Sequence, residues 1–225
     1  EELAASFGEE HNKRRFGDMS AHAKRSFNDQ FWNETAGCLY DVINGGQHDA
    51  SIRPNQLFAV SLKHSMLARE KAQSVVEIIE RELLTPFGLR SLASSDPDYR
   101  SRYEGGVWER DTAYHQGTVW PWLIGPFITA YVRVNGGTKR ARDRAKTFLA
   151  PIQAHLSDAG LGHISEIFDG DSPYQARGCV AQAWSVAEIL RAAVEDVEQV
   201  VEDLVAIFPD DARAEFQRAI ELDPS

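Results

Sequence analysis

The sequence has few cysteines, no excess of positive charge and no long apolar run. Its two cysteines, Cys38 and Cys179, are far apart, which gives weak support for a disulfide and none for a zinc site. We therefore expect a reducing, cytoplasmic compartment. No apolar run approaches the length of a membrane-spanning helix, and the first residues, Glu1-Glu2-Leu3, have no basic segment before an apolar one. We expect neither a membrane anchor nor a signal peptide.

The charge is unevenly distributed along the chain. Lys and Arg number 24 and Asp and Glu number 34, so the net charge is −10. The segment 195–225 holds ten acidic and two basic residues, a net of −8, which leaves −2 for residues 1–194. Nucleic acid is disfavoured as a partner because phosphate neutralisation needs a basic face. No glycine-rich phosphate loop, metal-ligand cluster or nucleophile elbow is present, so no cofactor or metal is implied.

Apolar periodicity predicts about six helices before residue 195, with few short strands. The expected helices span residues 20–32, 54–67, 70–84, 121–134, 138–155 and 178–193. Ser20 and Thr138 are expected to cap two of them, and Pro126 should distort a first turn or kink its helix. A short strand is expected at 37–42, followed by a turn at Asn44-Gly45-Gly46.

Two features of this predicted framework bear on function and domain organisation. The connection 88–118 is long for a compact domain, and long loops are more often functional than not. The helix 178–193 is expected to be mostly buried. Its expected buried positions include Val180, Trp184, Ala187 and Leu190.

The composition of the chain changes after residue 194, where acidic residues become frequent. Val197, Val200, Val201 and Leu204 predict one helix, and residues 212–222 predict another that resembles the second helix of a tetratricopeptide repeat. Because such a repeat cannot bury its face alone, we expect an acidic helical hairpin packed on the body. The expected domains are therefore 1–194 and an acidic helical tail, 195–225.

One stretch concentrates aromatic and amide side chains. It reads Tyr114-His115-Gln116-Gly117-Thr118-Val119-Trp120-Pro121-Trp122. Flat aromatic faces suit the C–H surfaces of sugars, and amide and imidazole groups suit their hydroxyls. The alternative is that both tryptophans belong to the core.

A second stretch, 162–171, is acidic and supplies candidate catalytic carboxylates. Glycoside hydrolysis needs two carboxyl groups, one as acid and one as base or nucleophile. The candidates near the aromatic stretch are Glu104, Glu109, Asp111, Glu166, Asp169 and Asp171. Glu166 is preferred because Ile164 and Ile167 flank it, which favours an ordered backbone. The alternative is that Glu166 has a structural role, in an ion pair with Arg177. Asp169 and Asp171 are expected to be ordinary acidic residues of a loop.

Six segments together resemble the C-terminal glucosidase region of glycogen debranching enzymes, the amylo-α-1,6-glucosidase type. The match covers most of residues 20–193. The segments are Phe31-Trp32-Asn33-Glu34, Leu39-Tyr40-Asp41-Val42, Ile52-Arg53-Pro54-Asn55-Gln56-Leu57-Phe58-Ala59-Val60-Ser61, the aromatic stretch, Ile164-Ser165-Glu166-Ile167-Phe168-Asp169-Gly170 and Ala181-Gln182-Ala183-Trp184-Ser185.

The resemblance implies both a fold and a set of site residues. It implies a barrel of six inner and six outer helices, of which residues 1–194 would form about half. The expected class is thus all-α, a portion of an (α/α)6 barrel with short strands in its loops. The resemblance makes Glu166 the catalytic base of an inverting α-1,6-glucosidase acting on a branched α-glucan or oligosaccharide. It makes Arg53, Asn55, Tyr114, His115, Gln116, Trp120 and Trp122 the substrate-binding residues, although Arg53 alone would also fit a surface arginine.

The chain departs from the family pattern at the general acid. In the family this acid is an aspartate in an upstream Trp-Met-Asp-Ala type of segment, and none of Asp18, Asp29, Asp41 and Asp49 has that context. We therefore expect the chain to be the C-terminal part of a longer enzyme and to be inactive alone. The missing N-terminal part of the same enzyme would be its partner.

Two other functions remain open. One is a non-catalytic carbohydrate-binding or interaction module, which the missing acid and the acidic tail would suit. The other is a sugar epimerase on the same kind of barrel. Epimerisation usually needs paired histidines, and His115 and His163 are the available pair, so this function ranks last.

Overall fold

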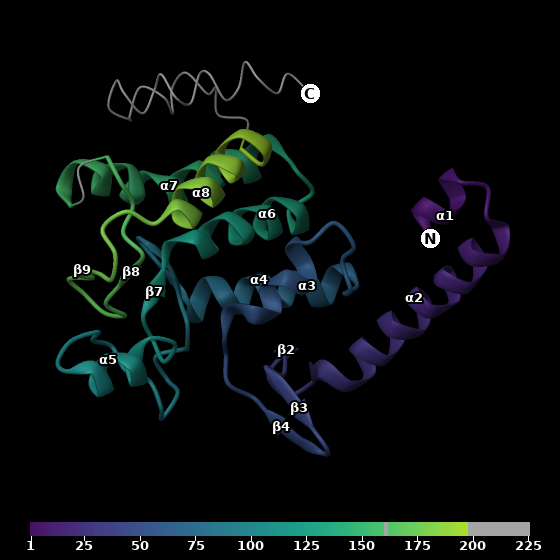
Figure 1. Ribbon diagram of the computed structural model, residues 1–225, viewed down its shortest axis with the longest axis horizontal. Helices are drawn as coiled ribbons and strands as arrows, with labels where there is room; N and C mark the ends of the chain where they lie inside the picture. Colours follow the sequence, from purple (N-terminus) through teal and green to yellow (C-terminus); the bar gives the residue numbers. More distant parts are fainter. Residues whose placement is uncertain (160–161, 198–225) are drawn as a thin grey trace.

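The structure is a computed structural model that describes residues 1–159 and 162–197, and it is mostly helical (Figure 1). The helices are α1 (Glu2–Ser6), α2 (Glu10–Phe31), α3 (Phe58–Ser61), α4 (Arg69–Glu82), α5 (Val107–Ala113), α6 (Ile124–Val134), α7 (Lys139–Asp158) and α8 (Ala183–Glu195). Two 3-10 turns, η1 (Pro54–Leu57) and η2 (Pro121–Leu123), lead into α3 and α6. The predicted helices of the segment 198–225 lie outside the described residues.

Helix α6 is at the centre of the core and contacts α3, α4, α7 and α8. Eight of its eleven residues are buried, as expected for a helix inside a core. Phe127 and Ile128 are fully buried on it, and Ile79 of α4 and Leu149 of α7 pack into the same cluster. These packed helices carry the pocket described below.

Several local predictions are confirmed. Thr138 caps α7, its side chain accepting a hydrogen bond of 3.3 Å from the backbone N–H of Ala141. Pro126 is the third residue of α6, where its missing N–H leaves no hydrogen bond unmade, and the turn before it is a 3-10 turn. Helix α4 buries Val75, Val76 and Ile79 on one face, as its periodicity predicts.

Other boundaries were predicted wrongly. Helix α2 begins at Glu10, not at Ser20, because its first turns are polar and give no apolar period to detect. Helix α3 ends at Ser61 rather than at residue 67, and α8 begins at Ala183 rather than at residue 178. The predicted loop 88–118 contains a strand, β6, and the helix α5.

Helix α2 stands away from the helical body, with α1 folded beside it (Figure 1). None of its residues is buried. Phe27 and Phe31 stack with ring centroids 4.9 Å apart and pack at the edge of the core. The side of the helix that carries these two rings is therefore the one that meets the body.

The strands are short and lie in the connections. β1 (Trp32–Asn33) pairs with β2 (Cys38–Leu39), and β3 (Val42–Asn44) with β4 (Gln47–Asp49) through the predicted Gly45-Gly46 turn. A five-stranded antiparallel sheet has the order β5 (Leu84–Thr85), β6 (Gly88–Arg90), β7 (Val119–Trp120), β8 (Ile167–Phe168), β9 (Ala176–Arg177). Val119 pairs with Phe168, so this sheet brings the aromatic and acidic stretches side by side.

Two further observations concern the described part of the chain. Cys38 is buried, Cys179 is exposed, and both are free thiols. In residues 1–159 and 162–197, no helix is both long enough and apolar enough to span a membrane.

Candidate active site

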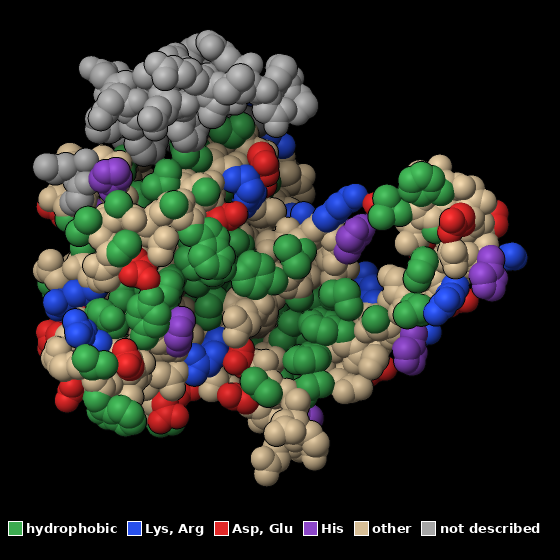
Figure 2. Space-filling model, viewed as in Figure 1, with side chains coloured by type: hydrophobic (Ala, Val, Ile, Leu, Met, Phe, Trp, Pro, Cys, Tyr) green, Lys and Arg blue, Asp and Glu red, His purple; other side chains and the backbone are tan. Residues whose placement is uncertain are grey.

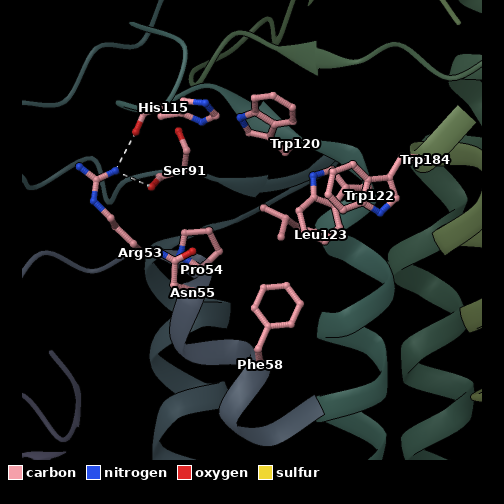
Figure 3. A pocket seen from close by; sticks show the side chains of 10 residues that line it. All are labelled: Arg53, Pro54, Asn55, Phe58, Ser91, His115, Trp120, Trp122, Leu123 and Trp184. Atoms are coloured by element: carbon pink, nitrogen blue, oxygen red, sulfur yellow. Dashed lines mark hydrogen bonds between the residues drawn. The ribbon is translucent and has the colours of Figure 1, made fainter. Parts of the chain in front are cut away.

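A pocket of about 380 Å³ lies between α3, the 3-10 turns, β7 and the start of α8 (Figure 3). Five of the seven predicted substrate-binding residues line it, namely Arg53, Asn55, His115, Trp120 and Trp122. Its other lining residues are Pro54, Phe58, Ser91, Leu123 and Trp184. Both predicted tryptophans are half-buried and also pack against the core, so the pocket and core interpretations each hold in part.

Arg53 is an anchored residue at one side of the pocket. Its guanidinium donates to the backbone oxygens of Ser91 and His115, at 3.1 Å and 2.7 Å, and also to Oε1 of Gln116. Its Nε lies 3.6 Å from Oδ2 of Asp41. The interpretation of Arg53 as an ordinary surface arginine is therefore wrong, because these partners fix the guanidinium across the aromatic stretch.

Asp41 also fixes a second predicted residue. The side-chain amide of Asn55 donates to Oδ1 of Asp41 at 2.8 Å. Asp41 thus orients both Arg53 and Asn55, a role that the sequence reasoning missed. The available signal was its place in Leu39-Tyr40-Asp41-Val42, one of the segments that carry the family resemblance.

His115 stacks on Trp120, with centroids 5.3 Å apart and 6° between the ring planes. Partial burial lowers the pKa of the His115 imidazole, and the positive charge of Arg53 lowers it further. A neutral imidazole offers one donor and one acceptor nitrogen. His115 can therefore exchange hydrogen bonds in both directions with a polyhydroxyl ligand.

Trp184 lines the pocket instead of lying in the core, which corrects the predicted face of the last helix. Its side chain is 53% exposed and Val180 is 67% exposed. The buried positions of α8 include Ser185, Ile189 and Leu190. Ala187 is likewise exposed, whereas Leu190 is buried as predicted.

Glu166 is held from two sides immediately before β8. Its Oε1 accepts a hydrogen bond from the hydroxyl of Tyr114, and its Oε2 accepts one of 2.9 Å from the backbone N–H of Cys179. The ring of Tyr114 lies 4.8 Å from that of His115 and 4.9 Å from that of Trp120. Tyr114 therefore connects Glu166 to the edge of the pocket.

The pKa of the Tyr114 hydroxyl is raised above its usual range. Burial of the phenol is the main cause, and the hydrogen bond to Glu166 and the charge of that carboxylate add to it. Tyr114 therefore stays a hydrogen-bond donor at neutral and mildly alkaline pH. Its predicted role as a pocket-lining residue changes, because the hydroxyl is directed at Glu166.

Gly178 makes room for the Glu166 carboxylate. Its φ is +68°, and a Cβ atom there would lie 2.5 Å from Oε2 of Glu166. A left-handed backbone and such a close approach together favour glycine. The turn that follows β9 is thus shaped around this one side chain.

Arg177 does not pair with Glu166, so that structural alternative is wrong. The guanidinium contacts Asp169 at 3.1 Å and Glu104 at 3.4 Å. Asp169 is fully buried and also accepts hydrogen bonds from Arg102 and from the backbone N–H of Tyr103. Asp169 is a buried structural acid, not the loop acid that the Asp-Gly turn suggested.

The other acidic candidates lie in different surroundings. Asp171 accepts a hydrogen bond of 3.0 Å from the hydroxyl of Tyr99 and lies 3.5 Å from Arg90. Glu104, Glu109 and Asp111 are exposed, as is His163. Among the described residues, no group of three His, Cys, Asp or Glu side chains is placed to hold a metal ion.

The sequence profile of the amylo-alpha-1,6-glucosidase family matches residues 1–191. The chain belongs to this family. A relative in Saccharomyces cerevisiae, a glycogen debranching enzyme, is 33% identical over 175 residues. That match covers 68% of this chain and 11% of the relative, so the chain spans about a tenth of the relative's length.

Similar solved structures agree with this family in fold. The neutral trehalase Nth1 from Saccharomyces cerevisiae has a TM-score of 0.56 at 14% identity, covering 88% of this chain and 35% of that one. A GH63 mannosylglycerate hydrolase from Thermus thermophilus has a TM-score of 0.52 at 17% identity, covering 72% and 34%. At these identities the likeness is one of fold, and it agrees with a mostly helical member of a glycoside hydrolase family.

Proposed function

We propose that the chain is the glucosidase region of a glycogen debranching enzyme. It would remove a glucose stub joined by an α-1,6 bond to a branched α-glucan, with Glu166 as the general base. Arg53, Asn55, His115, Trp120 and Trp122 would bind the substrate. Gln116 would act through Arg53, and Tyr114 through Glu166.

The observation that carries this proposal is the anchoring of Glu166 beside an aromatic pocket. Each carboxylate oxygen already accepts one hydrogen bond, from Tyr114 or from Cys179. An ionised carboxylate has about four acceptor positions, so positions remain for a water molecule. Glu166 would take a proton from that water while the hydroxide bonds to the anomeric carbon and the bond to the glucan oxygen breaks. That oxygen would take its proton from a general acid.

The general acid would come from a part of the enzyme outside this chain. No carboxylate is among the residues that line the pocket in the described part of the chain. Asp41, which contacts two lining residues, is bound by Arg53 and Asn55. The described helices would then form about half of an (α/α)6 barrel, and residues 1–194 would be the catalytic portion. A cytoplasmic location stays a prediction.

The test compares variants in the natural polypeptide that contains this chain. Glu166→Gln is expected to lower kcat about 100- to 10,000-fold on a trisaccharide with glucose α-1,6-linked to maltose. The KM should change little, because the amide keeps the shape of the side chain. Asp111→Asn, at an exposed acid on α5, is the matched control and should act like wild type. Wild-type kcat in Glu166→Gln would contradict the proposed base.

A second assay tests the missing acid. The isolated chain should not hydrolyse the trisaccharide at a measurable rate, because the absence of the general acid lowers the rate by about 100- to 10,000-fold. Hydrolysis by the isolated chain would show that an acid is present in it.

The second candidate function is a non-catalytic carbohydrate-binding module. The observation that favours it is the same pocket lining, which holds aromatic and amide groups without a carboxylate. If the natural polypeptide binds the trisaccharide, and Glu166→Gln changes neither its binding nor its activity, the chain would have this function instead.

A further inference from the structure

One end of the pocket has aromatic side chains that a single glucose would leave unused. The indole rings of Trp122 and Trp184 stack with centroids 4.1 Å apart and 19° between planes. The ring of Phe58 lies 5.9 Å from that of Trp122, at 22°. We call Phe58, Trp122 and Trp184 the aromatic ladder; it lies across the pocket from Arg53 and His115 (Figure 3).

Rigid elements hold this ladder in place. Trp122 is in η2 and Trp184 is in the first turn of α8, and these two elements pack on each other and on α6. The buried Ile189 and Leu190 fix α8 to the core. Trp184 is nevertheless 53% exposed. Hydrophobic side chains also gather on the face of the molecule that Figure 2 shows. A fixed, half-exposed indole presents a flat apolar face at little cost in conformational entropy.

The ladder also has unused hydrogen-bond donors. The indole N–H of Trp120 donates to the backbone oxygen of Tyr114 at 3.3 Å and to Oγ1 of Thr118 at 3.1 Å. The indole N–H groups of Trp122 and Trp184 have no such partner within residues 1–159 and 162–197. Apolar ring faces beside free N–H donors match a sugar ring, which has C–H faces and hydroxyl edges.

The charge of the pocket points to a neutral ligand at this end. Arg53 is the charged side chain of the described lining, and it lies at the opposite side. Its charge is also engaged by Asp41. A phosphate or carboxylate ligand would therefore find no cationic partner along the ladder.

We propose that the aromatic ladder binds a second sugar ring, the chain glucose to which the α-1,6-linked stub is attached. Trp184 is its specificity-determining residue. This inference rests on the proposed function, because it assumes that the stub occupies the Arg53 and His115 side. It makes the site selective for a stub on a glucan over free glucose.

The test measures carbohydrate binding by calorimetry in the natural polypeptide that contains this chain, with Glu166→Gln present in every variant to prevent hydrolysis. The ligands are glucose and the trisaccharide in which glucose is α-1,6-linked to maltose. Trp184→Ala is expected to weaken trisaccharide binding about five- to tenfold and to leave glucose binding within about twofold. Trp184→Phe should keep most of the affinity, because it retains an aromatic face. Trp108→Ala is the matched control, since Trp108 is 76% exposed on α5 and is not part of the pocket lining.

Each other outcome overturns a stated part of the argument. If the wild type binds the trisaccharide and Trp184→Ala binds it equally well, the ladder is not a sugar site, while the proposed function stands. An equal loss for glucose and trisaccharide in Trp184→Ala would mean that Trp184 supports the pocket instead of selecting the ligand. If this polypeptide with Trp184 unchanged binds neither ligand, the proposed carbohydrate function fails together with this inference.

Discussion

The hydroxyl of Tyr114 donates a hydrogen bond to Glu166, 52 positions later in the sequence. The pairing of β7 with β8 brings these residues together, since Val119 opposes Phe168 in that sheet. The backbone N–H of Cys179 holds the other carboxylate oxygen. This arrangement fixes the orientation of the carboxylate before any ligand binds, as a general base requires.

The ionisation of Tyr114 should depend on Glu166. In Glu166→Gln the carboxylate charge is lost and a neutral amide oxygen, a weaker acceptor, replaces it, so the pKa of Tyr114 should fall, although burial keeps it above its usual value. Ultraviolet absorbance of tyrosinate, followed over alkaline pH, measures this change. Subtracting the curve of Tyr114→Phe isolates Tyr114 from the other five tyrosines. Identical Tyr114 curves for wild type and Glu166→Gln would refute the contact.

Gly178→Ala should disturb both the backbone and Glu166. A left-handed φ costs an alanine about 1–2 kcal/mol, and the added Cβ would also displace the carboxylate. Gly136→Ala is the control, because its φ of +73° is similar and its nearest neighbour, a methyl of Thr138, is 4.0 Å away. In urea denaturation both variants should lose stability, and Gly178→Ala should lose more. A smaller loss in Gly178→Ala would argue against the close approach.

Asp169→Asn should be strongly destabilising. The carboxylate is buried and contacts the guanidinium groups of Arg102 and Arg177, so removing its charge takes away the buried carboxylate that both of them pair with. Breaking such a buried pair costs about 3 kcal/mol. Asp171→Asn is the comparison. The Asp171 side chain is 46% exposed, so this substitution should lower the free energy of unfolding by less than about 1 kcal/mol. Equal free energies of unfolding for the two variants would contradict the buried role.

His155 should make the protein less stable in mild acid. Burial lowers the pKa of its imidazole from the ordinary 6.5, while Asp158 opposes this slightly. Below pH 6.5 the unfolded chain binds more protons, so the free energy of unfolding falls until the pH reaches the lower folded pKa. The slope is at most about 1.4 kcal/mol per pH unit for each histidine. The similarly lowered pKa of His115 contributes with the same sign.

The measurement is urea denaturation between pH 7 and pH 5. His155→Gln should start from a lower stability, because the contact of Nε2 with Ser165 at 3.2 Å is changed, but its stability should depend less on pH. His163→Gln, at an exposed histidine, is the matched control. The same slope in His155→Gln as in wild type would exclude His155 as the cause.

Features encoded by neighbouring residues were predictable. The apolar stripe of α4, the Thr138 cap and the first turn around Pro126 depend on side chains a few positions apart. The residue types of the aromatic stretch indicated a pocket, and its tryptophans do line one. The choice of Glu166 among six acids stays a prediction, now with a defined geometry around it.

Features that depend on distant partners were not predictable. Arg53 meets Gln116 across 63 positions, and Arg102 meets Asp169 across 67, so neither environment can be read from local sequence. Asp169 and Asp171 look alike in the sequence, yet one is fully buried and the other half-exposed.

The sequence by itself determined the family, the main helices and the chemistry available to the site. Only the tertiary structure decided which face of α8 is buried, because apolar residues lie on several sides of that helix and its neighbours select among them. The same choice directs Trp184 into the pocket. The tertiary structure also decided which partner each charged group has, because ion pairs form between segments that the folded helices and the small sheet bring together.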